Sequence, residues 1–81
     1  MKVDVKLFAM VRERAGAGCV SLELAEGADV AAAMGALVEK MPSLRGHVEH
    51  VAYAVNLAYA PAERKLRDGD ELAVIPPVSG G

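Results

Sequence analysis

Apolar and charged residues alternate over residues 2–7, where every second side chain is Val or Leu. A period of two is typical of a strand that buries one face. Residues 20–24 repeat the alternation, and a short stretch that Gly16 and Gly18 interrupt lies between the two segments. We therefore expect two strands that pair as a hairpin, with a helical or turn segment over residues 9–14 between them.

The pattern becomes helical after Asp29. Apolar residues recur at spacings of three and four, at Val30, Ala33, Met34, Leu37, Val38 and Met41. Asp29 is a good N-cap, because its carboxylate can accept a bond from the free amides of a helix start. Pro42 disfavours helical geometry at the residue before it. These features predict a helix that starts after Asp29, ends at Met41 and lays one face against a sheet. Gly35 lies off that face, and we attribute it to close packing.

The second half of the chain predicts three further strands. Residues 51–55 are apolar on both sides, which favours an interior strand. Residues 58–60 form a short edge strand after a turn, and Asp68-Gly69-Asp70 is a turn signal before a last strand over residues 71–75.

This order of elements predicts an α+β fold. A single main helix on one face of a mixed sheet of about four to five strands is the simplest layered solution. It matches the β-grasp, or ubiquitin-like, arrangement. Residues 1–75 are expected to form the domain and residues 76–81 a flexible, extended C-terminal tail.

Composition narrows the classes of function. The 81 residues suit one domain, and the net charge of −2 is spread along the chain without a basic stripe for nucleic acid. A single cysteine, Cys19, cannot form an internal disulfide. The charged start is unlike a signal peptide, and no apolar run approaches the length of a membrane span. We expect a cytoplasmic domain that binds neither nucleic acid nor membrane.

Few side chains suggest catalysis. His47-Val48-Glu49-His50 could supply two or three metal ligands, but no further strong ligand follows at a known spacing, so we expect a solvated loop and no metal site. Cys19 has no basic neighbour in sequence to lower its thiol pKa, which favours a structural role. No nucleophile–base set or phosphate loop is present in the sequence. An enzyme acting alone is therefore not expected.

One face of a sheet that carries a single helix stays uncovered. Phe8, Tyr59 and Ile75 are apolar residues that we place on or near that face, where exposed apolar patches usually mark a partner surface. The alternative for Phe8 is that it closes the core.

The end of the chain has the clearest chemistry. Pro76 and Pro77 favour an extended path, and Val78 and Ser79 lead to Gly80 and Gly81. Glycine has no Cβ, so this end can enter a narrow channel. A free carboxylate on such an end is a group that another enzyme can activate.

Several motifs together resemble the small subunit of molybdopterin synthase. They are Leu7-Phe8-Ala9, Val11-Arg12-Glu13, Ala54-Val55-Asn56, the segment from Leu66 to Ala73, and the ending Pro-Pro-Val-Ser-Gly-Gly. The resemblance covers essentially the whole chain. It implies a sulfur carrier whose Gly81 carboxylate is adenylated by an ATP-dependent enzyme similar to ubiquitin-activating enzymes.

The resemblance also implies the partners. A desulfurase or rhodanese-like donor would supply sulfur to give a thiocarboxylate, and the large synthase subunit would use it to build the dithiolene of molybdopterin within a heterotetramer. Phe8, Tyr59 and Ile75 fall on apolar contacts to both partner proteins, Arg12 falls on the family's Arg-Glu pair, and residues 76–79 lead the tail into the large subunit. No permanently bound cofactor is implied, since ATP is used by the activating enzyme.

Three alternatives stay open. The chain could carry sulfur for thiamin thiazole, tRNA thiolation or a tungsten cofactor. It could be a protein modifier that is joined through Gly81 to lysines of its targets. It could also be a ubiquitin-like interaction module in which the tail has no chemical part.

Overall fold

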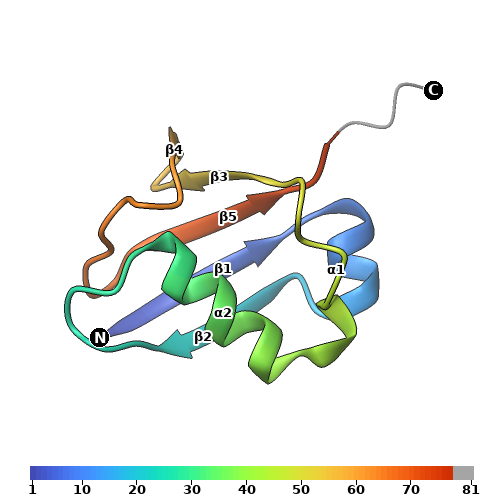
Figure 1. The fold of residues 1–81 in the computed structure, drawn as a ribbon, viewed down its shortest axis with the longest axis horizontal. Coiled ribbons are helices and arrows are strands. Elements are labelled where there is room, and N and C mark those ends of the chain that lie inside the picture. Colours follow the sequence, from blue (N-terminus) through green and yellow to red (C-terminus); the bar gives the residue numbers. More distant parts are fainter. Residues whose placement is uncertain (78–81) are drawn as a thin grey trace.

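A computed structural model of the chain describes residues 1–77, and Val78, Ser79, Gly80 and Gly81 lie outside the described residues. Figure 1 shows a twisted sheet with helices beside it. The elements are β1 (Lys2–Leu7), α1 (Ala9–Ala15), β2 (Cys19–Glu23), α2 (Val30–Lys40), the 3₁₀ turn η1 (Pro42–Leu44), β3 (Ala52–Val55), β4 (Ala58–Ala60) and β5 (Glu71–Ile75). The predicted order of strands and main helix is confirmed.

The sheet order is β2-β1-β5-β3-β4. β1 pairs antiparallel with β2, as the expected hairpin, and parallel with β5, so the first and last strands are neighbours at the centre. β3 is interior, between β5 and the short edge strand β4. Because β1 and β5 run in the same direction, both end at the same edge of the molecule, where the tail leaves (Figure 1).

The core lies on one face of the sheet. Alternate residues of β1 are buried there against the apolar side of α2, and α1 and η1 each add one fully buried side chain. These core residues include Val3, Val5, Leu7, Val11, Val30, Ala33, Met34, Leu37, Leu44, Leu72 and Val74. Asp29 caps α2 as predicted, since its carboxylate accepts a bond from the Ala32 amide at 2.9 Å. No helix within residues 1–77 has the length and apolar character that crossing a membrane requires.

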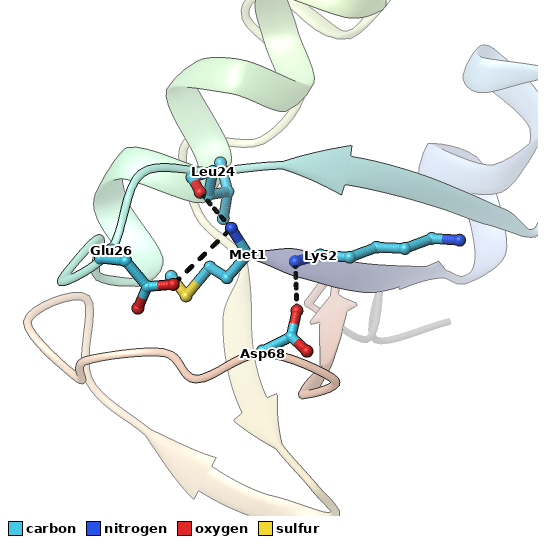
Figure 2. Close-up of polar contacts among 5 residues, drawn as sticks. All are labelled: Met1, Lys2, Leu24, Glu26 and Asp68. Carbon is cyan, nitrogen blue, oxygen red and sulfur yellow. Dashed lines mark hydrogen bonds and ion pairs between the residues drawn. The ribbon is translucent and has the colours of Figure 1, made fainter.

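The start of β1 is tied to two other parts of the chain (Figure 2). The Met1 ammonium donates to the Leu24 carbonyl at 2.7 Å and lies 4.0 Å from the Glu26 carboxylate. The Lys2 amide donates to Asp68 Oδ1 at 2.7 Å, and the Gly69 amide donates to the Lys2 carbonyl at 2.8 Å. The turn at residues 68–70 is thus fixed against β1.

Asp70, which is nearly buried, links that turn to the turn after β3. Its Oδ1 accepts from the Asn56 side-chain amide at 2.9 Å, and its Oδ2 accepts from the Arg67 backbone amide at 2.8 Å. Asn56 Oδ1 in turn accepts from the Glu71 backbone amide at 3.0 Å, and the Asn56 backbone amide donates to the Glu71 carbonyl at 2.9 Å. The Asn56–Asp70 network therefore clamps the β3–β4 turn to the start of β5.

The Asn56 and Arg67 hydrogen bonds hold the pKa of Asp70 below its ordinary value of 3.8, against the opposing effect of burial, and the nearby Arg64 and Arg67 charges add to the lowering. A lowered pKa means that the unfolded chain binds the proton more readily. The stabilisation is thus complete above pH 3.8 and is lost as pH falls through the lower value in the folded state.

Replacing Asp70 by Asn should remove this part of the acid sensitivity. Asp70→Asn should cost about 1–3 kcal/mol at neutral pH, since an amide cannot accept both bonds. As pH falls below 3.8, the difference in free energy of unfolding between the wild type and the variant should become smaller. Urea midpoints measured across acidic and neutral pH check this, and an identical pH profile for the two proteins would contradict it.

Gly35 corrects a detail of the sequence interpretation. It is exposed on α2, and a Cβ added there would meet no atom within 4 Å. The prediction that Gly35 allows close packing is therefore wrong. The position has no structural need for glycine.

Gly35→Ala should therefore stabilise the fold by about 0.5–1 kcal/mol, because alanine loses less backbone entropy in a helix. Gly69, at φ 86°, is the matched control, since alanine there would be strained. Chemical denaturation of both variants gives the measurement, and a destabilised Gly35→Ala protein would refute the prediction.

Candidate docking face and tail

An apolar groove of about 450 Å³ lies on the face of the sheet opposite α2. Its lining residues are Phe8, Ala54, Leu57, Tyr59, Ala73 and Ile75. They come from the β1–α1 junction, β5, β3, β4 and the β3–β4 turn. We call this surface the apolar groove.

Strand register explains why these residues meet. Ala54 of β3 lies opposite Tyr59 of β4 on one side and Ala73 of β5 on the other. Leu72 and Val74 point into the core, so Ala73 and Ile75 point to the opposite face. The two alanines leave the floor of the groove low between the larger side chains at its rim.

The structure brings together three of the residues singled out from the sequence. Phe8, Tyr59 and Ile75 all line the apolar groove, with Phe8 46% and Tyr59 80% exposed. The alternative that Phe8 closes the core is not what the structure shows. Sequence reasoning missed Ala54, Leu57 and Ala73, although the period of two in the last strand carried a signal for Ala73.

Leu57 has the most exposed side chain of the large apolar residues in the part of the chain that the structure describes. Its side chain is 92% exposed, and it follows Asn56 in the two-residue turn between β3 and β4, with φ 49° and 72° at the two positions. Positive φ at both residues is the type I′ hairpin geometry, which favours glycine at the second position. A residue with a Cβ pays about 1–2 kcal/mol there.

The tail leaves beside the apolar groove. Ile75 ends β5, Pro76 is buried and Pro77 is exposed. A chain of four further residues can reach at most about 14 Å. Any protein that grips Gly81 must therefore lie against this end of the sheet.

The remaining polar candidates lie elsewhere. The exposed Arg12 on α1 stands over Gly18, where an added Cβ would come within 3.2 Å of the guanidinium carbon. It lines a separate hollow with residues 16–18 and not the apolar groove. Cys19 is an exposed free thiol. Residues 1–77 contain no group of three His, Cys, Asp or Glu side chains placed to hold a metal ion.

Comparisons with known proteins show the family of this chain. The ThiS family model matches residues 5–81. The molybdopterin synthase sulfur carrier subunit of Mycobacterium tuberculosis is 42% identical, over 100% of this chain and 99% of the relative.

Solved structures share the fold. Small archaeal modifier protein 1 of Haloferax volcanii matches with a TM-score of 0.94 and 35% identity over 100% of both chains. A second match is a chain from the Helicobacter pylori complex of subunits 1 and 2 of molybdopterin-converting factor. Its TM-score is 0.70, with 23% identity over 100% of both chains. The chain thus belongs to the ThiS family of ubiquitin-like β-grasp proteins, among the molybdopterin synthase sulfur carrier subunits.

Proposed function

We propose that this chain carries sulfur as a thiocarboxylate on Gly81 and delivers it to the large subunit of molybdopterin synthase for the dithiolene of molybdopterin. The observation that supports this most directly is the position at which the last strand ends. The last strand ends beside an exposed apolar groove, so one partner can hold the domain and receive the tail together.

The chemistry begins with activation. A carboxylate oxygen of Gly81 attacks the α-phosphate of ATP on an adenylyltransferase, and pyrophosphate leaves. The terminal sulfur of a donor persulfide then displaces AMP from the acyl carbon. A thiol then attacks the donor's sulfur in the resulting acyl disulfide, which forms a disulfide between thiol and donor and leaves the thiocarboxylate on Gly81.

A thiocarboxylate is charged at neutral pH and is a sulfur nucleophile. In the large subunit its sulfur would be transferred to the pterin precursor, and water would restore the Gly81 carboxylate. This chain needs no catalytic side chain for these steps. Its contribution is to dock, and to present a tail whose prolines limit the entropy lost on binding and whose glycines fit a narrow channel.

The other parts of the proposal follow from this cycle. ATP is the only cofactor that we invoke, and it is bound by the activating enzyme. An ATP-dependent cycle that draws on a desulfurase or rhodanese-like donor belongs in the cytoplasm. One small subunit per large subunit would then assemble into the heterotetramer that the family resemblance implies.

A protein modifier is a second candidate, because the chain closely resembles small archaeal modifier protein 1 in sequence and fold. The same acyl adenylate could acylate a lysine amine of a target protein, with AMP as the leaving group. The two functions share activation and differ in the acceptor.

Incubation with ATP, an activating enzyme and a sulfur source should replace one oxygen by sulfur on the C-terminal peptide, as read by intact and peptide mass spectrometry. Deleting Gly81 should abolish this exchange and leave the fold intact. Cys19→Ser is the matched control and should still be thiolated at the C-terminus. Sulfur on Cys19 with Gly81 unmodified would rule out the proposal, and a ladder of lysine conjugates on denaturing gels would favour the modifier.

A further inference from the structure

We infer that Leu57 is a docking anchor that inserts into an apolar socket on the large synthase subunit and sets how the carrier domain lies when its tail enters the active site. This inference rests on the proposed function. It adds a residue outside the tail, at the end of the apolar groove far from the tail exit, to the surface that selects the partner.

The first support is that the backbone strain at Leu57 is not offset by burial of its side chain within this chain. Leu57 adopts φ 72°, in a turn whose geometry favours glycine at that position, and its side chain is 92% exposed. Within the described residues, a leucine at this position is neither buried nor favoured by the backbone conformation. A partner that covers the Leu57 side chain would remove it from water, and the favourable free energy of that burial would offset the strain.

The second support is rigidity. The Asn56 side chain is bonded to Asp70 Oδ1 at 2.9 Å and to the Glu71 amide at 3.0 Å. Both neighbouring strands pair with β3, so the turn is held from three sides. The backbone of Leu57 is therefore held in one position, so little backbone entropy is lost when a partner binds there.

The third support is the route of the chain. The apolar groove runs from Ile75, where the tail begins, to Leu57 at the other end of β3. Because the tail is short, the protein that receives Gly81 lies against the Ile75 end and can extend along the groove to Leu57. We assign this surface to the large subunit, since relatives that match over the whole chain are named as subunits of molybdopterin synthase and the proposed function makes its large subunit the protein that receives Gly81.

Two substitutions separate strain from docking. Leu57→Gly restores the preferred turn residue, and Leu57→Asn keeps a side chain of similar size that tolerates positive φ. Both variants should melt at a higher temperature than wild type, by about 4–8 °C for Leu57→Gly. Both should bind the large subunit at least tenfold more weakly in titration calorimetry.

The matched control is Met10→Ala. Met10 is a large apolar residue on α1 that is 43% exposed and lies outside the apolar groove, so its loss should leave the affinity for the large subunit unchanged. Affinity that survives both Leu57 substitutions would overturn the inference. So would a loss seen only in the KM of the activating enzyme, or a loss seen only in self-association of this chain.

Failure of the proposed function would look different. Wild-type chain that gains no sulfur at Gly81 would refute the carrier role regardless of Leu57. Wild-type chain that is thiolated while Leu57→Asn binds the large subunit normally would refute the anchor alone.

Discussion

The parallel pairing of β1 with β5 determines where everything else in this molecule can lie. It joins the first and last strands at the centre of the sheet and makes both end at one edge. Phe8, at the end of β1, and Ile75, at the end of β5, therefore become neighbours on the rim of the apolar groove beside the tail exit. With any antiparallel pairing of these strands, the tail would leave at the opposite edge from Phe8.

Covering only one face of the sheet has the second large consequence. α1, α2 and η1 all contribute to one core, and the opposite face keeps its apolar side chains exposed next to the tail. The same face becomes polar toward β2, where Ser21 donates to Asp4 Oδ1 at 2.8 Å. Under the proposed function, this boundary between an apolar and a polar part of the face would orient the partner relative to the C-terminal carboxylate.

Much of this could be predicted from local sequence. Alternation gave the β1–β2 hairpin, and the cap at Asp29 and the proline at position 42 gave the bounds of α2 within a residue. The parallel β1–β5 pair could not be read from either strand, because a contact across more than sixty residues is decided by packing. The Asn56-Leu57 turn was predicted but the left-handed geometry of Leu57 was not, since that follows from a register set by Ala54, Tyr59 and Asp70.

The central claim is that the uncovered face of the sheet holds the partner while the tail does the chemistry. Methyl chemical-shift mapping of the full chain during titration with the large subunit tests it most directly. The account predicts shifts or broadening at the groove methyls of Ala54, Leu57, Ala73 and Ile75, with the exposed α2 methyls of Ala31 and Ala32 unaffected. Perturbation centred on the α2 methyls, with the groove methyls unchanged, would contradict it.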